Sequence, residues 1–389
     1  MRLTSRILNL GTEAAFEVLA KAQALEAQGK DIIHLEIGEP DFDTPSHIVE
    51  AGVKALRDGY THYGPTAGLM EMREAIARNS REVRGIDTVP AHVVVTPGAK
   101  PVMFYAILAL VEPGTEVIYP NPGFPIYESL VRFAGATPVP MRLLEEKSYH
   151  PDLDDLATLI TDRTRLIILN SPENPCGSIL TLPELETIAD LVRQHDDLYV
   201  LTDEVYKDIL YTGEHHSIAS LPGMAERTII LDGFSKSYAM TGWRLGYGIM
   251  PEEVAYHVTR LAVNNISCPA TFTQIAGIAA LDGPQDAVQS MAAEFAGRRQ
   301  LISDGLRSIP GIRCPEPEGA FYAFPNISET GLTSRQFEDR VMQEAGVALL
   351  SGSGFGEFGE GYVRISYANS RENIQKALDR LDTFVRGLV

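Results

Sequence analysis

Cysteine is scarce in this sequence, and basic residues are outnumbered by acidic ones. Three cysteines, Cys176, Cys268 and Cys314, lie far apart, with no CxxC pair among them. An odd and sparse set of this kind excludes a disulfide framework and favours a reducing compartment, so we expect a cytoplasmic protein. The 33 Lys and Arg residues against 52 Asp and Glu residues give a net charge of −19. Because an acidic surface repels nucleic acid and anionic lipid, neither is expected as a partner.

Long apolar runs and repeats are also lacking. The longest apolar run, Val102 to Val111, falls well short of the roughly 20 residues that span a bilayer. No internal repeat, low-complexity tract or Gly/Ser linker divides the chain. With 389 residues, 44% of them hydrophobic, the chain has the composition of a folded protein of one large domain or two ordinary ones.

What is present is an alternation of short apolar runs with helical patterns. Most of these runs are almost wholly apolar, as strands covered by helices on both faces should be. Alternation of this kind predicts an α/β fold with a mostly parallel central sheet and helices on both of its faces. The predicted strands are residues 92–96, 116–120, 165–170, 199–204, 228–233 and 244–250.

The two ends of the chain have a different pattern. Residues 14–29 are expected to form a helix that ends at Gly29, followed by a strand over 32–37. Near the C-terminus, strands are expected over 321–324 and 362–367. The last helix presents one apolar face at 3–4 spacing, made by Ile374, Ala377, Leu378, Leu381, Phe384, Val385 and Leu388.

These patterns predict how the chain divides. We expect a large domain over residues 45–285 and a smaller α+β domain formed by residues 1–44 together with 286–389. A ligand is expected in the crevice between them, at the C-terminal ends of the strands.

The segment Asp232–Arg244 is the most informative one. It places Lys236 just after a predicted buried strand and behind a Gly-Phe-Ser turn. A lysine removed from water has a lowered pKa and becomes a nucleophile toward carbonyl groups. Taken alone, however, the same pattern also fits a surface lysine in a turn.

Two further strand ends carry polar side chains. Asp203 and, three residues on, Tyr206 follow the predicted strand 199–204; an aspartate there can face a pyridinium nitrogen, and a tyrosine can bond a phenolic oxygen. Asp203 could equally cap a helix. Two prolines fix the loop that holds Asn174, whose amide can bond a ligand oxygen.

Two segments are suited to anions. The sequence Thr96–Lys100 is a strand end, a glycine turn and a helix start, which together can bind phosphate through free backbone N–H groups. Arg364 lies within an otherwise apolar predicted strand. A buried arginine needs an anion, and its planar guanidinium suits a carboxylate, either of a ligand or of an internal Asp or Glu.

Together these segments, in this order and over nearly the whole chain, resemble the class I aminotransferases of pyridoxal-phosphate fold type I, near the aspartate-aminotransferase-like branch. The most specific part of the resemblance is Ser235-Lys236 with Arg244 eight residues after the lysine. The resemblance implies a transaminase dependent on pyridoxal 5'-phosphate, which the large domain binds. It also implies a homodimer with shared active sites.

The resemblance also implies roles for single residues. Lys236 is expected to hold the cofactor aldehyde as a Schiff base, Asp203 to face the ring nitrogen, and Tyr206 with Asn174 to contact the ring oxygen. Other implied cofactor contacts are Ala99, the backbone N–H of Lys100, Phe124 stacked on the ring, Ser235, Arg244, and Tyr63 reaching the neighbouring subunit's phosphate. The substrate α-carboxylate is expected on Arg364, Asn174 and the backbone of Gly38.

The expected reaction moves an amino group from an amino acid, aspartate first, to a 2-oxo acid such as 2-oxoglutarate. Alanine, aromatic or basic donors stay open, as does a β-lyase or decarboxylase on the same fold. No metal site is expected: His215-His216 has no paired ligand set and is expected in a solvated loop.

Overall fold

The computed structural model describes residues 3–8 and 10–388. Met1, Arg2, Asn9 and Val389 belong to the predicted terminal domain and lie outside the described residues. Within the described part, no helix is both long enough and apolar enough to cross a membrane.

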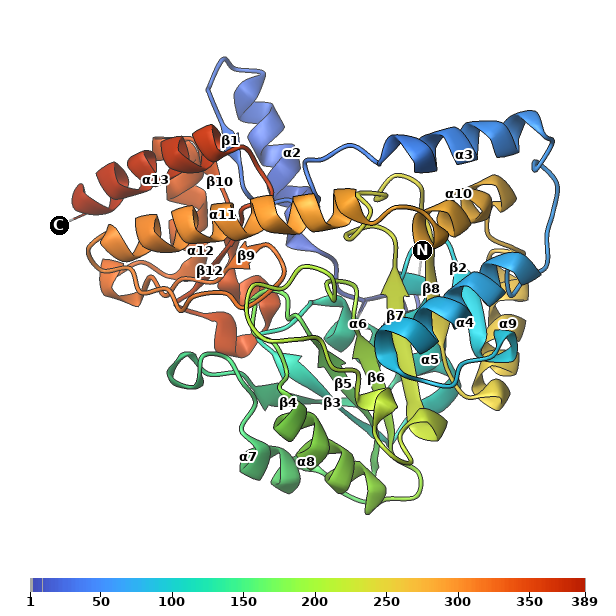
Figure 1. The fold of residues 1–389 in the computed structure, drawn as a ribbon. Helices are drawn as coiled ribbons and strands as arrows, with labels where there is room; N and C mark the ends of the chain where they lie inside the picture. The colour runs from blue at the N-terminus through green and yellow to red at the C-terminus, as the bar shows by residue number, and fades with distance from the viewer. Residues whose placement is uncertain (1–2, 9, 389) are drawn as a thin grey trace.

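A seven-stranded sheet is the centre of the structure, with the strand order β2-β8-β7-β6-β5-β3-β4 (Figure 1). β8 alone runs opposite to the other six strands, which confirms the mostly parallel sheet. Its strands are β2 (Val93–Thr96), β3 (Glu116–Asn121), β4 (Thr137–Arg142), β5 (Thr164–Asn170), β6 (Tyr199–Asp203), β7 (Thr228–Gly233) and β8 (Gly246–Ile249).

One of these strands, β4, was not expected from the sequence. It contains Pro138 and Pro140 and pairs with β3 alone, at the edge of the sheet. Proline is tolerated at such an edge because only one side of the strand has to supply ladder hydrogen bonds. The two prolines therefore hid a strand whose position in the sheet makes them acceptable.

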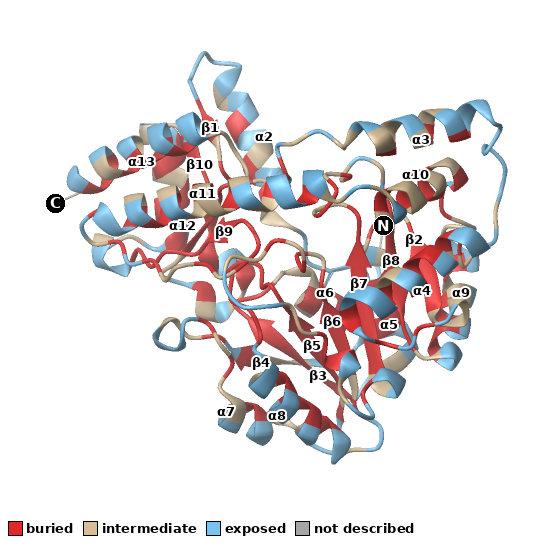
Figure 2. Ribbon diagram, viewed as in Figure 1, coloured by how far each residue is buried: buried red, intermediate tan, exposed pale blue. Residues whose placement is uncertain are grey.

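Helices cover both faces of the sheet, as predicted, and its strands are almost wholly buried except for the edge strand β4 (Figure 2). Successive strand residues point to opposite faces, so Leu166 and Ile168 pack with one set of helices while Ile167 and Leu169 pack on the other side. The first face carries α5 (Lys100–Leu110), α6 (Ile126–Ala134) and α9 (Glu252–Asn265). The second carries α3 (Ser46–Arg57), α4 (Met70–Arg84), α7 (Leu153–Leu159), α8 (Leu182–Arg193) and α10 (Thr271–Asp282).

Segments from both chain ends meet beside this sheet. Strand β1 (Ile33–His34) pairs in parallel with β10 (Val347–Ala348), and a separate antiparallel sheet has the order β11-β12-β9. The predicted terminal strands are present but shorter than expected, at β9 (Tyr322–Ala323) and β12 (Val363–Ser366); β11 is Leu350–Ser351. The helices here are α2 (Ala14–Glu26), α11 (Asp286–Ser308), α12 (Ser334–Arg340) and α13 (Arg371–Arg386), while α1 (Ser5–Leu8) lies against α6. We call β1, β9–β12, α2 and α11–α13 the terminal region.

The predicted apolar face of the last helix is confirmed. All of its predicted residues except Leu388 are buried, and Leu388 packs against the same core. The pairing of β1 with β10 agrees with a small domain built from both termini, whereas the predicted boundaries at 44 and 286 stay predictions.

Candidate functional site

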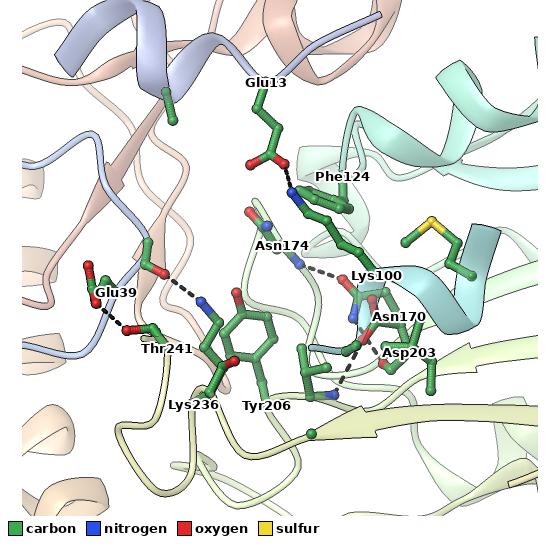
Figure 3. Close-up of a pocket in the computed structure, with 18 of the residues that line it drawn as sticks. Glu13, Glu39, Lys100, Phe124, Asn170, Asn174, Asp203, Tyr206, Lys236 and Thr241 are labelled. Atoms are coloured by element: carbon green, nitrogen blue, oxygen red, sulfur yellow. Dashed lines mark hydrogen bonds and ion pairs between the residues drawn. The ribbon is translucent and has the colours of Figure 1, made fainter. Parts of the chain in front are cut away.

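A cavity of about 560 Å³ lies between the C-terminal edge of the seven-stranded sheet and the terminal region (Figure 3). Parallel strands end at one edge, so the loops after β3, β5, β6 and β7 bring their polar residues together. Of the predicted site residues, the structure places these in the cavity wall: Gly38, Ala99, Lys100, Phe124, Asn174, Asp203, Tyr206, Ser235, Lys236, Arg244 and Arg364.

Lys236 follows β7 and turns its side chain into the cavity. Its Nζ donates a hydrogen bond of 2.5 Å to the backbone oxygen of Gly38 and lies 5.7 Å from the centre of the Tyr206 ring. Removal from water, together with the positive charge of Arg364, lowers the pKa of Lys236 to about 8, although Glu39 and Glu13 oppose this. An amine with such a pKa is neutral often enough near neutral pH to attack a carbonyl group, so the surface-turn interpretation is excluded.

Asp203 ends β6 and is buried. The Tyr127 hydroxyl donates to Asp203 Oδ2 at 2.8 Å, and the backbone N–H of Val205 donates to Oδ1 at 3.3 Å. Burial raises the pKa of Asp203 to about 7 against the lowering effect of these two bonds. Among the described residues no cationic side chain pairs with this carboxylate, so its ionised form would gain from a positively charged ring nitrogen placed beside it.

The first turn of α5 faces the cavity at its N-terminus. Ala99 is the N-cap residue and Lys100 the first helical residue, so backbone N–H groups free of helical partners point outward there. Arg244 lies opposite; its Nη1 donates to the Thr241 backbone oxygen at 2.8 Å, and it pairs with no carboxylate of the described residues. Gly98, at φ +85°, lies so close to the guanidinium that a Cβ there would collide with it. This combination fits a phosphate group.

Arg364 points into the opposite end of the cavity from β12. It is only 5% exposed, and its guanidinium donates to Asn174 Oδ1 at 3.2 Å and to the Glu36 backbone oxygen. Its Nε has no hydrogen-bond partner, and its charge lies 4.5 Å from the centre of the Tyr322 ring. Since no Asp or Glu of the described part pairs with Arg364, the internal ion pair left open by the sequence is absent, and the free donors fit a ligand carboxylate.

The remaining predicted residues have defined neighbours. The Tyr206 hydroxyl lies 2.8 Å from that of Tyr322. Phe124 packs edge-on against Tyr127, with ring centres 5.6 Å apart, and Asn170 accepts a 2.9 Å bond from the Asn174 backbone N–H. Tyr63, by contrast, lies outside the cavity and is 91% exposed.

Among the residues of this site that sequence reasoning missed are Tyr127, Tyr322 and Glu13. Tyr127 lies in the first turn of α6, Tyr322 lies within a two-residue strand, and Glu13 is one of several acidic residues near the N-terminus. None of them belongs to a local motif, because each reaches the cavity only through tertiary packing. The continuous apolar run around Tyr322, residues 320–324, was the one available signal.

The expectation of a solvated loop at His215 was wrong. Its Nε2 lies 3.1 Å from Glu204 Oε2, and its side chain is 9% exposed. Glu204 also pairs with Arg84, which binds Asp232 in turn, so these residues form a buried ion network beneath β6 and β7. No cluster of three or more potential metal ligands occurs among residues 3–8 and 10–388.

Known proteins resemble this chain over nearly its full length. The family model described as aminotransferase class I and II matches residues 30–381. An aspartate aminotransferase of Pyrococcus abyssi is 44% identical over 92% of both chains, and an aromatic-amino-acid aminotransferase of Thermococcus litoralis is 41% identical over 99% of both. The solved structure of aspartate aminotransferase from Thermus thermophilus with maleate superposes with a TM-score of 0.94 at 37% identity, covering 98% of this chain and all of that one.

Proposed function

Because the chain belongs to the class I and II aminotransferases and is a transaminase of their fold, we propose that its amino donor is a dicarboxylic amino acid. Aspartate is the first candidate, with 2-oxoglutarate as acceptor and pyridoxal 5'-phosphate as cofactor. One observation supports this choice: of the four cationic side chains in the cavity wall, the other reactants account for three and leave one, Lys100.

The residues present fit pyridoxal 5'-phosphate. Lys236 would hold its aldehyde carbon, Asp203 its ring nitrogen, and the α5 N-terminus with Ser235 and Arg244 its phosphate. Tyr206 and Asn174 would contact its ring oxygen, and Phe124 would cover its ring. When bound, the cofactor supplies an electron sink for the charge that develops at the substrate Cα.

Two of these residues determine where protons are held during the reaction. The ionised Asp203 carboxylate would keep a proton on the ring nitrogen of a bound cofactor, and the Tyr127 hydroxyl orients this carboxylate. The Lys236 amine takes the proton from the substrate Cα and returns it in the reverse half-reaction, a transfer typically worth 10²–10⁴-fold in rate. Its lowered pKa suits both directions.

The substrate is fixed by its α-carboxylate. Arg364 has free donors, and the Asn174 amide that it contacts belongs to the same wall. A bidentate bond from a buried guanidinium fixes both the position and the plane of a carboxylate. This contact is common to every amino acid and therefore carries no preference among side chains.

Preference arises at Lys100. Its backbone N–H faces the expected phosphate site, whereas its ammonium group, which pairs with Glu13 in this structure, lies 5.4 Å from the centre of the Phe124 ring and is not needed by the cofactor. A cation at this place would bind the distal carboxylate of aspartate or 2-oxoglutarate. Alanine and aromatic donors offer no such group, although 2-oxoglutarate as acceptor would use it with any donor.

We also propose a homodimer with shared sites. The Tyr63 side chain is 91% exposed in the single chain and lies outside the cavity wall, and aromatic side chains are enriched where subunits meet. The cytoplasmic location inferred from the cysteine content stays a prediction.

A donor screen with 2-oxoglutarate tests the substrate proposal. Wild-type protein is expected to use aspartate with a higher kcat/KM than alanine or phenylalanine, and Lys100→Gln is expected to remove that advantage. Equal rates for aspartate and alanine in the wild type would refute the choice of donor. Release of pyruvate and ammonia without a new amino acid would indicate a lyase instead.

Two experiments address the cofactor and the dimer. Borohydride reduction followed by peptide mapping should place the label on Lys236, and a label on another lysine would refute the assignment. Mixing Tyr63→Phe with Lys236→Ala chains should restore activity, because the hybrid dimer has one site with both native residues. A fully active species that sediments as a monomer would refute the proposal that two subunits share each active site.

A further inference from the structure

Two buried tyrosine hydroxyls meet at the wall of the cavity. Among the described residues, the only hydrogen-bond partner of the Tyr206 hydroxyl is the hydroxyl of Tyr322, at 2.8 Å. The two rings meet edge-on, with centres 5.7 Å apart and planes at 84°. Tyr206 follows β6 of the seven-stranded sheet and Tyr322 lies in β9 of the terminal region, so this bond joins the two sides of the cavity.

The Tyr322 hydroxyl is held in place from two sides. Gly38 faces it with its α-carbon, and a Cβ at that position would collide with the hydroxyl oxygen. The guanidinium of Arg364 lies 4.5 Å from the centre of the Tyr322 ring. Neither neighbour offers an acceptor here, because an α-carbon has none and a guanidinium only donates. Of the described residues, only Tyr206 is therefore placed to accept the Tyr322 proton.

Both tyrosines keep their protons near neutral pH. Burial raises the pKa of Tyr206 and of Tyr322, although the positive charge of Arg364 opposes the rise in both. Each hydroxyl has one proton to donate, so one tyrosine donates within the pair and the other has its proton free for a third partner. The charged groups around the pair are Arg364, Lys236, Asp203 and Glu13.

We propose that Tyr322 is a positioning residue for the cofactor: its hydroxyl donates to Tyr206 and thereby directs the single Tyr206 proton to the ring oxygen. This inference rests on the proposed contact between Tyr206 and the ring oxygen of pyridoxal 5'-phosphate. A Tyr206 hydroxyl that donates to that oxygen cannot also donate to Tyr322, so the bond within the pair must run from Tyr322 to Tyr206. Successive hydrogen bonds polarise one another, and the Tyr206 bond is therefore strengthened by about 10–30%.

The Schiff base at Lys236 would report the strength of this bond. Figure 3 shows Lys236 beside Tyr206, with Nζ 5.7 Å from the centre of the Tyr206 ring. In pyridoxal the ring oxygen and the aldehyde are on neighbouring ring atoms, so negative charge on the oxygen stabilises a proton on the Schiff-base nitrogen. A hydrogen bond to the oxygen neutralises part of that charge and lowers the pKa of the Schiff base.

The size of the effect follows from the strength of a charge-assisted hydrogen bond. Loss of the whole Tyr206 bond should raise the pKa of the Schiff base by about 1–2 units. Loss of the Tyr322 donor alone removes only the cooperative part, which corresponds to a rise of roughly 0.2–0.6 unit.

The test is a pH titration of the Schiff-base absorbance in the holoenzyme. Tyr322→Phe keeps the aromatic ring beneath Arg364 and removes only the hydroxyl. It is compared with wild type, with Tyr206→Phe and with the double variant. Tyr149→Phe is the matched control, because the Tyr149 hydroxyl is also buried and donates to the Phe324 backbone oxygen at 3.0 Å, but lies outside the cavity wall. Urea unfolding of Tyr322→Phe and Tyr149→Phe measures what each lost hydroxyl costs in stability.

Tyr322→Phe should raise the pKa of the Schiff base by roughly 0.2–0.6 unit and Tyr206→Phe by about 1–2 units. Tyr149→Phe should titrate like wild type, whatever stability it loses. In the Tyr206→Phe background, Tyr322→Phe should produce no further rise, because its effect passes through the Tyr206 hydroxyl.

An unchanged or lowered pKa in Tyr322→Phe overturns the inference, as does an equal rise in Tyr149→Phe or an undiminished rise in the Tyr206→Phe background. If Tyr206→Phe itself leaves the pKa unchanged, the proposed contact of Tyr206 with the ring oxygen fails, and the inference fails with it. If Tyr206→Phe raises the pKa while Tyr322→Phe does not, only the inference about Tyr322 fails.

Discussion

Glu173 gives the most quantitative prediction, because a buried carboxyl in its position should make stability fall as the pH rises. Its side chain lies in the loop before Asn174 and is 2% exposed. Oε2 accepts a 2.6 Å bond from the Cys176 backbone N–H, whereas Oε1 has no partner. Burial, with a smaller contribution from the charge of Asp203, raises the pKa of Glu173 to about 8 from an ordinary value of 4.5.

The direction of this pH dependence follows from the number of protons that the folded and the unfolded chain bind. Between pH 4.5 and pH 8 the folded chain holds a proton on Glu173 that the unfolded chain has released, so the free energy of unfolding decreases as the pH rises through this window. Each pH unit is worth about 1.4 kcal/mol, which limits the whole effect to roughly 5 kcal/mol. About 2 kcal/mol of it should develop between pH 6 and pH 7.5.

Glu173→Gln removes this titration and keeps the shape of the side chain. The stability of the variant relative to the wild type should therefore rise with pH, by roughly 2–3 °C in melting temperature between pH 6 and pH 7.5 for a chain of this length. The amide oxygen of the new side chain can still accept the hydrogen bond from the Cys176 backbone N–H. Any loss of stability caused by its NH₂ group is independent of pH.

Thermal melts of both proteins at equal concentration across this range provide the measurement. Glu186→Gln, the same chemical change at an exposed position of α8, controls for the lost negative charge. A stability of Glu173→Gln relative to wild type that stays flat, or that falls, as the pH rises would refute the reasoning.

Three other variants test separate contacts. Arg364→Ala should lower kcat/KM about 10²–10⁴-fold for every donor alike, because a charge-assisted bidentate contact is lost; a loss confined to dicarboxylates in steady-state assays would contradict its role. Tyr127→Phe removes the donor to Asp203 and should weaken cofactor retention about tenfold, measured as cofactor released on dilution; wild-type retention would argue against that role. Arg84→Met leaves Glu204 and Asp232 buried without their cation and should cost about 3–5 kcal/mol of stability in urea unfolding. The exposed Arg78→Met should cost under about 1 kcal/mol, and a similar cost for both would refute the importance of the buried network.

The sequence predicted those parts of the site in which local pattern and chemistry coincide. Lys236, Asp203 and the first turn of α5 each follow an apolar strand, and strand ends in a parallel sheet converge without further information. The central strands were located to within two residues, since burial on both faces leaves near-continuous apolar runs.

What could not be predicted depends on contacts between distant segments. Tyr322 reaches Tyr206 across 116 residues, and the Glu13 carboxylate reaches Lys100 across 87. His215 looked polar and solvated because its partner, Glu204, belongs to another element. Whether a proline-containing segment such as 137–142 forms a strand likewise depends on how many neighbouring strands it must hydrogen-bond, which the local sequence does not show.

Strand β4 has a consequence for how copies of this protein behave at high concentration. Thr137 and Leu143 donate their backbone N–H groups toward β3, so alternation along the strand turns the backbone nitrogens of Pro138 and Pro140 to the outer side. Those two nitrogens carry no hydrogen, and the open edge lacks the donors that another sheet would need to extend it. The same residues that conceal the strand in the sequence thus protect this edge of the seven-stranded sheet from pairing with the edge of another copy.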